Sequence, residues 1–259
     1  MKEIKNIFWL LSICLSVLYS CSTDNNDNVK YLKKVVEVSD DGTSATSLFI
    51  YNGDEIVSID GVHKHTDFTY TDGLITKIVT LDKESQELET IEYSYIEGRL
   101  VSVKSLNNYR VNYVHNSDGT VSYEKWSLNL GNEDVKISHG TLYFQNENLV
   151  KDERIIENTG VGVVSNYSIS FEYDSKKNPL FAILGYKKLL NHYQRISLNN
   201  SLVSIEIVSI TREDQITSSA NFYKSTFKYD SDGYPTEQVS ERALFDNGTT
   251  AYLKTQYFY

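Results

Sequence analysis

Apolar and polar residues alternate with a period of two along most of the chain, and one short phrase recurs within this alternation. Each copy has two aromatic residues separated by one residue, then a tip rich in Asp, Asn and Gly, and then two aliphatic residues three positions apart. Because successive side chains of a strand point to opposite faces, each copy predicts a β-hairpin with its aromatic residues on one face. The clear copies are Phe49/Tyr51 with Ile56/Ile59, Phe68/Tyr70 with Ile75/Ile78, Tyr93/Tyr95 with Leu100/Val103, and Phe171/Tyr173 with Leu180/Ile183.

Weaker copies extend the repeat to about eight hairpins. They are Val111/Tyr113 before residues 117–119, Leu142/Phe144 before residues 146–148, Ile196/Leu198 with Leu202/Ile205, and Phe227/Tyr229 before Pro235. The segment LGYKKLLNHY, residues 184–193, has some helical spacing, but it lies between two copies of the phrase. We therefore predict strand or loop there.

The tips have the chemistry of tight turns. Asn-Gly and Asp-Gly supply the positive φ angles of hairpin turns. They occur at Asn52-Gly53, Asp72-Gly73, Asp118-Gly119 and Asp232-Gly233. The aliphatic residues that follow a tip are three positions apart, which would place them on opposite faces of a regular strand. A β-bulge after the turn would bring both onto the aromatic face, so we expect a bulge there.

These features predict one all-β domain over residues 31–259. We expect about 16 or 17 strands, arranged as a curved antiparallel meander of about eight β-hairpins with the aromatic face inward. The composition favours strands as well, because the chain has 20 tyrosines and only 2 prolines among 259 residues.

The N-terminus predicts export. Lys2 and Lys5 precede an apolar run, residues 7–18, which suits the core of a signal peptide and is too short to cross a bilayer as a helix. The next residues, Leu-Tyr-Ser-Cys at 18–21, resemble the lipobox of bacterial lipoproteins. That resemblance implies cleavage before Cys21 and acylation of this cysteine, which would anchor the protein without a membrane span. Ordinary signal cleavage that leaves a free thiol is the alternative.

The expected domain organisation follows from this N-terminus. Residues 1–20 form the signal peptide, residues 21–30 form the lipidated cysteine and a disordered tether, and the repeat domain follows. Cys14 lies within the signal peptide, so an internal disulfide is not expected in the mature chain. The formal net charge of −10 argues against nucleic acid as a partner, since nucleic acid is bound by a basic face.

The phrase FKYDSDGYP, residues 227–235, resembles the YD repeats of Rhs-type proteins. The resemblance is closer to a family of Bacteroidota lipoproteins of unknown function that are built from such units, and it extends over residues 46–259. It implies hairpin-repeat architecture and a lipid-anchored location at the outer membrane, on its periplasmic face or at the cell surface. Rhs proteins use many more units to enclose a cargo, so the resemblance does not imply that function.

Two groups of residues are candidates for metal binding. The aspartates of the tips supply too few convergent oxygens for calcium, and turn chemistry explains them. These aspartates are Asp72, Asp118, Asp174, Asp230 and Asp232. His63, His65 and Asp67 would share one face of an extended segment and could bind a transition metal, but we expect a solvated loop there. We therefore assign no metal and no cofactor.

The sequence predicts binding rather than catalysis. It has no Gly-x-Ser-x-Gly motif and no phosphate-binding loop, and no catalytic residue is assigned. The expected function is a non-enzymatic binding or adhesion module of the cell envelope, with a glycan or peptide ligand held by exposed tyrosines. Segments 108–126 and 209–227 are the places where such tyrosines are expected.

The chain end, LKTQYFY at residues 253–259, supports an alternative function. Outer-membrane barrels often end in an aromatic residue, so the alternative is an outer-membrane structural or barrel-like protein; a glycan-active enzyme is a weaker one. A membrane barrel needs an apolar outward face and an even number of strands. The expected hairpins plus a half-unit give an odd number, which favours an open sheet. The residues between the aromatic pairs are also polar, namely Thr69, Ser94, Asn112, Glu172 and Lys228.

Overall fold

The computed structural model describes residues 29–106, 108–128, 134–157, 160–243 and 250–259. The described chain is all-β, as predicted, apart from two short 3-10 helices, η2 (Tyr186–Lys188) and η3 (Leu190–Ile196). Its strands are β1 Lys34–Ser39, β2 Ser44–Asn52, β3 Glu55–Gly61, β4 Lys64–Thr71, β5 Leu74–Asp82, β6 Leu88–Ile96, β7 Arg99–Ser105, β8 Tyr109–His115, β9 Val121–Ser127, β10 Val135–Gln145, β11 Asn148–Ile156, β12 Val163–Lys177, β13 Asn199–Arg212, β14 Gln215–Tyr229, β15 Pro235–Ala243 and β16 Thr250–Phe258.

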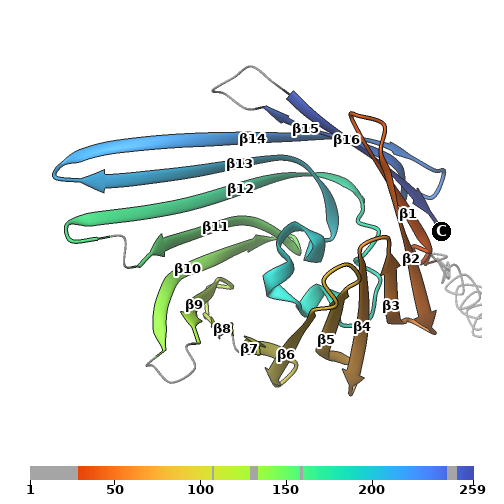
Figure 1. Ribbon diagram of the computed structural model, residues 1–259, viewed down its shortest axis with the longest axis horizontal. Coiled ribbons are helices and arrows are strands. Elements are labelled where there is room, and N and C mark those ends of the chain that lie inside the picture. The colour runs from red at the N-terminus through yellow and green to blue at the C-terminus, as the bar shows by residue number, and fades with distance from the viewer. Residues whose placement is uncertain (1–28, 107, 129–133, 158–159, 244–249) are drawn as a thin grey trace, which may run out of the picture.

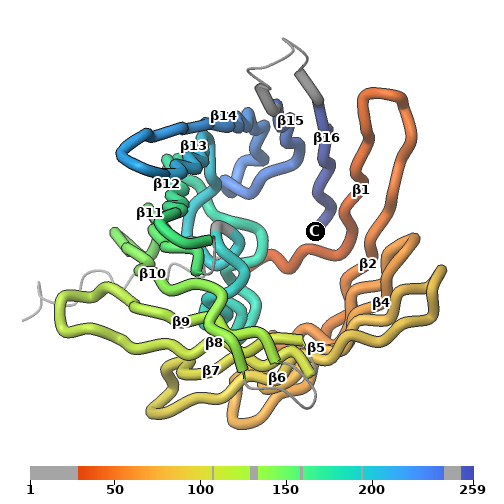
Figure 2. The backbone as a smooth tube through the Cα atoms, turned by 60° about the vertical axis from the view of Figure 1, so that its left-hand side comes forward, coloured from red at the N-terminus to blue at the C-terminus, as the bar shows by residue number. Residues whose placement is uncertain are grey.

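The strands form one closed antiparallel barrel, in which each strand pairs with its neighbours in the chain. The barrel closes where β1 pairs with β16, from Lys34 opposite Phe258 to Ser39 opposite Leu253. Figure 2 shows these two strands side by side, although they lie at opposite ends of the sequence. The predicted open meander is therefore wrong, because its first and last strands join and leave no free edge between them.

The described chain has sixteen strands, within the predicted 16 or 17. The odd number expected from eight hairpins and a half-unit is wrong, because two of the expected hairpins are one. Phe171/Tyr173 lies on β12 and Leu202/Ile205 on β13, and these strands pair directly with each other. Residues 178–198 are inserted between them and contain Leu180, Ile183 and Ile196, which match the repeated phrase but lie on no strand. We call this insertion the plug. With these two copies merged, the half-unit at the chain end pairs with β1, and the count becomes even.

The predicted bulges are confirmed. On β2 and β3, Tyr51 lies opposite Ile56 while Ile50 lies opposite Ser58, so Val57 is an extra residue. The extra residue lets Ile56 and Ile59 both face the interior despite their spacing of three. The same register shift follows the turns between β4 and β5, between β6 and β7, and between β10 and β11.

Of the four predicted Asn-Gly and Asp-Gly turns, one forms as expected. Asp72 and Gly73 have φ angles of 51° and 71° and form a two-residue turn between β4 and β5. In the first hairpin Asn52 pairs with Glu55, so the turn consists of residues 53–54 rather than Asn52-Gly53. At Asp118-Gly119 and Asp232-Gly233 only the glycine has a positive φ, 87° and 81°, and each pair lies in a longer loop, at residues 116–120 and 230–234.

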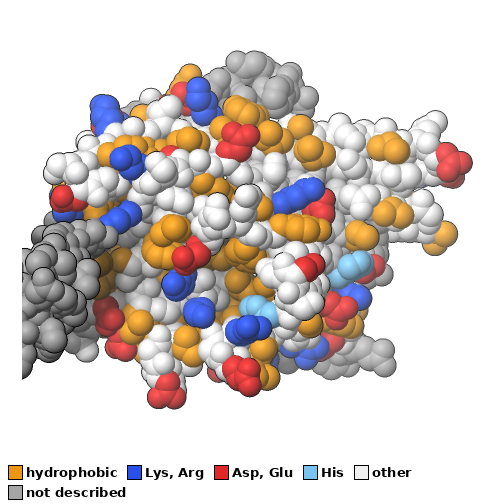
Figure 3. All heavy atoms as spheres, turned by 180° about the vertical axis from the view of Figure 1, so that it is seen from behind, with side chains coloured by type: hydrophobic (Ala, Val, Ile, Leu, Met, Phe, Trp, Pro, Cys, Tyr) orange, Lys and Arg blue, Asp and Glu red, His pale blue; other side chains and the backbone are white. Residues whose placement is uncertain are grey.

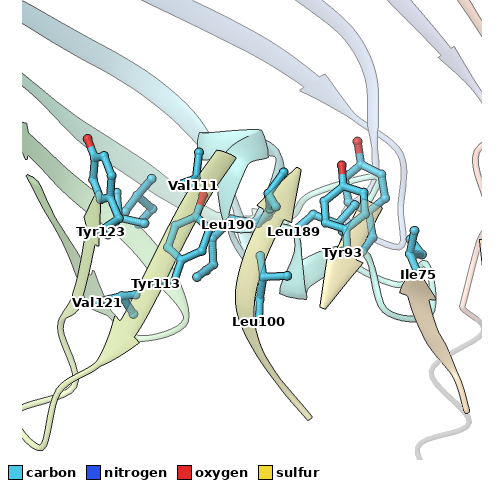
Figure 4. Close-up of a cluster of buried hydrophobic side chains, with 14 of the residues drawn as sticks. Ile75, Tyr93, Leu100, Val111, Tyr113, Val121, Tyr123, Leu189 and Leu190 are labelled. Carbon is cyan, nitrogen blue, oxygen red and sulfur yellow. The ribbon is translucent and has the colours of Figure 1, made fainter. Parts of the chain in front are cut away.

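The plug fills part of the barrel interior, where it forms the hydrophobic core together with the strands. Figure 4 shows Leu189 and Leu190 of the plug among inward side chains of the wall, and Figure 1 shows the plug within the ring of strands. Ile183 and Leu189 are buried in one hydrophobic cluster with Ile56, Ile75 and other wall residues. Barrels of this many strands usually enclose a water-filled channel, so the plug takes the place of that channel. The prediction of strand or loop at residues 184–193 was wrong, because part of this segment is helical and buried.

The outward face of the wall carries the polar residues between the aromatic pairs, as expected, but it also carries exposed aliphatic residues such as Leu48, Ile50 and Ile207. Thr69, Ser94, Glu172 and Lys228 are exposed there, and Asn112 is half-buried. Acidic and basic side chains are interspersed over this surface in Figure 3. Ion pairs cross between neighbouring strands, with N–O distances of 2.9 Å for Lys136–Glu124, 2.7 Å for Lys228–Glu237 and 2.7 Å for Lys254–Glu237.

One side of the barrel extends beyond the rest. The ends of β13 and β14 project past β10 and β11 in Figure 1. Residues 215–220 of β14 are exposed on both of their faces, unlike any strand segment of the short side that packs on the plug. The barrel interior therefore has a higher wall on the side of β12–β14.

Candidate functional site: a cavity inside the barrel

A cavity of about 440 Å³ lies inside the barrel between the plug and the inward faces of β11 and β12. Its volume is in the range of about 300–1,000 Å³ that is typical of small-ligand sites. The strands contribute Arg154, Tyr167, Ile169 and Phe171, and the plug contributes Asn191, His192, Tyr193 and Arg195.

Strand register explains the wall side of the cavity. Arg154 lies opposite Tyr167, and Asp152 lies opposite Ile169. Because alternate residues share a face and Ile169 packs on the core, all four side chains face inward. The Arg154 guanidinium lies over the Tyr167 ring at 3.7 Å from its centre, which is a cation–π contact.

The plug side is held by hydrogen bonds to the wall. Asn191 Nδ2 donates to the Tyr93 hydroxyl at 3.4 Å, and His192 Nε2 lies 3.4 Å from the same oxygen. The other His192 nitrogen, Nδ1, lies 3.4 Å from the Tyr186 hydroxyl. The plug residues therefore meet the cavity from a supported segment rather than from a free loop.

Tyr193 has a strained backbone. Its φ of 50° and ψ of −128° are rarely adopted by residues other than glycine. Such conformations cost on the order of 1–3 kcal/mol and are found most often at functional sites. The strained turn directs the ring to the cavity, where the Tyr193 hydroxyl accepts a hydrogen bond from Arg154 Nη1 at 3.3 Å.

Three buried polar atoms at or next to the cavity have no hydrogen-bond partner. They are Arg154 Nε, Asn191 Oδ1 and Asp152 Oδ2. An unsatisfied buried group costs about 1–3 kcal/mol, so such groups are rare and point to a missing partner. The other carboxylate oxygen of Asp152 accepts a hydrogen bond from the Tyr123 hydroxyl at 2.7 Å.

The electrostatics of the cavity favour negative charge. Burial, together with the nearby Arg195, lowers the pKa of His192 to about 4, so this imidazole is neutral at pH 7. Burial raises the pKa of Asp152 and so opposes its ionisation. Burial and the neighbouring Arg154 lower the pKa of Lys125 on the adjacent wall, which is the direction expected beside another cation.

A second cavity of about 510 Å³ lies near the start of the plug and includes Asp174, Phe227 and Tyr229. Tyr229 donates a very short hydrogen bond to Asp174, so these polar groups satisfy each other. Among the described side chains, no unsatisfied buried polar atom lines this second cavity. The cavity at the plug is therefore the better candidate for a ligand site.

The candidates identified from the sequence lie elsewhere. Cys21 and the predicted signal peptide are outside the described residues. His65 and Asp67 lie on β4 rather than in a loop, and His63 lies just before that strand. His65 Nδ1 is 2.8 Å from Asp60 and its Nε2 is 3.1 Å from Asp67, so carboxylates engage both ring nitrogens. No group of three or more metal-binding side chains was found among the described residues.

The tip aspartates take part in their turns. Asp118 Oδ1 accepts a hydrogen bond from the backbone N–H of Thr120 at 3.0 Å. Asp230 Oδ1 accepts hydrogen bonds from the backbone N–H groups of Asp232 and Tyr234, at 2.9 and 3.0 Å. These are the local side-chain-to-backbone bonds expected of Asp in turns.

The expectation of exposed tyrosines in segments 108–126 and 209–227 was wrong. Tyr113 and Tyr123 are buried in the core, whereas Tyr109, Tyr223 and the other described aromatic residues of these segments are half-buried, and none is exposed. Sequence reasoning also missed the cavity residues Arg154, Asn191, Tyr193 and Arg195. The available signal was the segment 184–193, which interrupts the repeat.

Comparisons with known proteins give the architecture. No family model matches the chain, and no curated protein matches it. A porin-like protein from Bacteroides vulgatus is similar in structure, with a TM-score of 0.55 and 14% identity over 88% of this chain and 98% of that one. A porin-like protein from Bacteroides uniformis has a TM-score of 0.52 and 13% identity over 89% of this chain and 98% of that one.

At this low identity the comparisons establish the fold alone. Both neighbours agree with a closed barrel. For the architecture, they support the barrel-like alternative over the predicted open meander. No helix among the described residues is long and apolar enough to cross a membrane.

Proposed function

We propose that the protein is a barrel-shaped lipoprotein of the cell envelope that binds a small ligand inside the barrel without catalysing a reaction. The cavity at the plug carries this proposal, because it combines a volume suited to a small ligand with polar atoms that have no partner in the protein. A ligand that supplies these partners would recover their cost of burial.

The charged side chains of the outer wall support a barrel that faces water rather than lipid. A membrane barrel presents an apolar band about 25 Å tall to the bilayer. Here ionic side chains such as Glu124, Lys136 and Glu237 occupy the outward face, while the repeated aromatic pairs face the core. A role as an open pore is also disfavoured by the plug, which packs into the interior.

In this proposal the acylated Cys21 attaches the barrel to the outer membrane. Lys30, near the start of the described chain, has its Nζ atom 2.7 Å from Asp230 and 2.5 Å from Asp232 at the turn between β14 and β15. The tether would therefore join the barrel at the end that carries the tight turns. Arg154 lies about 20 Å along β11 from that end, so the cavity would face away from the anchor.

A ligand screen tests this function. The full-length protein, purified in mild detergent, is applied to a glycan array and to a small-molecule library read by thermal shift. Ile169→Trp fills the cavity, and Ile207→Trp places the same ring on the exposed outward face of β13 as a control. We expect saturable binding by the wild type and Ile207→Trp, and its loss in Ile169→Trp. Equal binding by all three would place the site elsewhere, and hydrolysis of any glycan would favour an enzyme.

A further inference from the structure

We propose that the ligand is an acidic sugar, a pyranose ring that carries a carboxylate. This inference rests on the proposed binding function and adds the chemical class of the ligand. It draws on the charge of the cavity, on its aromatic walls and on the kind of polar atoms that have no partner.

The charges around the cavity select an anion. Arg154 and Arg195 line it, and no acidic side chain does so among the described residues. Two inward carboxyls lie on neighbouring strand positions: Asp152, which accepts a hydrogen bond from Tyr123, and Glu206, which lies opposite Ile169 on β13. Arg154 Nε is a buried donor without a partner, and a guanidinium is suited to bind a carboxylate through paired hydrogen bonds.

The aromatic walls select a ring with C–H faces. Tyr167, Phe171 and Tyr193 line the cavity together with Ile169. The negative face of an aromatic ring attracts the weakly positive C–H groups on one face of a pyranose. The stacking of Arg154 on Tyr167 keeps the guanidinium beside this surface, so one ligand can meet both.

The other unsatisfied atom at the cavity, Asn191 Oδ1, favours a ligand with hydroxyl groups that can donate to it. Asn191 Oδ1 is a buried acceptor without a partner, while Asn191 Nδ2 already donates to Tyr93. A sugar hydroxyl can donate to this oxygen. A free phosphate or acetate would satisfy Arg154 but would leave both Asn191 and the aromatic walls without a complement.

Matched acid and ester probes test the charge. Isothermal titration of the full-length protein uses disaccharides of glucuronate, galacturonate and mannuronate, each beside its own methyl ester, which keeps the ring and removes the charge. We expect at least one acid to bind at least ten-fold more tightly than its ester. Arg154→Gln should reduce that ratio to about one, whereas Arg99→Gln, at an exposed position on β7, should leave it unchanged.

A second variant covers the case in which Arg154→Gln does not fold, as judged by circular dichroism. Arg195 is exposed, so Arg195→Gln should fold, and it should weaken binding of the acid at least three-fold while leaving the ester unchanged. Two probes address other ligands, a tripeptide with a central glutamate and sodium phosphate. Binding of the tripeptide in preference to every sugar would overturn the inference.

The outcomes separate this inference from the proposed function. If esters bind as tightly as acids, or if only a neutral compound from the screen binds and Ile169→Trp abolishes its binding, the cavity is a site but its ligand is not an acidic sugar. If no uronate binds and the screen finds no compound that Ile169→Trp blocks, the proposed function fails together with the inference.

Discussion

The Tyr93 hydroxyl connects two cavity residues of the plug to the barrel wall. It accepts a hydrogen bond from Asn191 and lies within hydrogen-bond distance of His192. The tyrosine itself belongs to the repeated aromatic pair and is buried in the core. A residue of the repeat has therefore acquired a second role at the site, which its position in the phrase does not reveal.

Tyr93→Phe should destabilise the fold by about 1–3 kcal/mol, because it leaves two buried polar groups of the plug without a partner. Urea denaturation measures this change. Tyr143→Phe is the matched control, since its hydroxyl bonds Glu153 on the outward face, and it should cost less than about 0.5 kcal/mol. Equal losses in both variants would show that Tyr93 does not support the plug.

His65 should make stability depend on pH. The hydrogen bond to Asp60 raises the pKa of His65, so folding favours the protonated imidazole. Its contribution is fully present below the pKa of an unfolded histidine, about 6.5, and is lost as the pH rises through the higher folded value. His65→Gln should therefore lower Tm more at about pH 5 than at about pH 9. Equal lowering at both values, with His63→Gln as control, would contradict this assignment.

At the scale of elements, the sequence was informative wherever the structure is local. The spacing of three between Ile56 and Ile59 predicted a bulge, and the register between β2 and β3 contains it. The plug was missed because its own apolar residues, Leu180 and Ile183, resemble a returning strand. Their burial depends on walls supplied by distant strands, which a local pattern does not contain.

Gly185 tests how the plug docks. Its φ is 71°, and a Cβ there would lie 3.2 Å from Gly73 O and from Ile75 N on the wall. Gly162 has the same φ of 71° but open space around it. Gly162→Ala therefore measures only the free-energy cost of placing alanine at this positive φ. We expect Gly162→Ala to cost about 1 kcal/mol and Gly185→Ala to cost at least 1 kcal/mol more by urea denaturation. Equal costs would mean that the plug is not closely docked at β5.

At the scale of the whole molecule, closure was the part that the sequence could not supply. The pairing of β1 with β16 joins residues separated by almost the full chain, so neither strand carries a local signal of its partner. The aromatic half-unit at the chain end indicated a strand, and the polar residues between the aromatic pairs correctly indicated the outward face. Arg154 could not be identified as a site residue, because the plug that completes the cavity was read as part of the repeat.

The proposed anchor is tested by Cys21→Ala. If Cys21 carries the acyl chains, the variant should move from the membrane fraction to the aqueous fraction, since each buried methylene contributes about 0.8 kcal/mol to membrane binding. Cell fractionation and the intact mass of the purified protein give the readout. Membrane attachment that persists with an unchanged mass in the variant would contradict lipidation.

Residues 22–259, produced without signal peptide or lipid, test whether the wall faces water. The fragment contains every strand of the barrel, and cross-strand ion pairs such as Lys136–Glu124 and Lys254–Glu237 lie on its outward face. A bilayer would have to desolvate these charges, whereas water solvates them and the repeated aromatic pairs stay in the core. We therefore expect a folded, monodisperse monomer in detergent-free buffer, with a circular dichroism spectrum dominated by strand. The matched control ends at residue 249, which removes β16, opens the barrel between β1 and β15 and should aggregate. If residues 22–259 fold only when detergent is added, the outward face meets lipid and the protein is a membrane barrel.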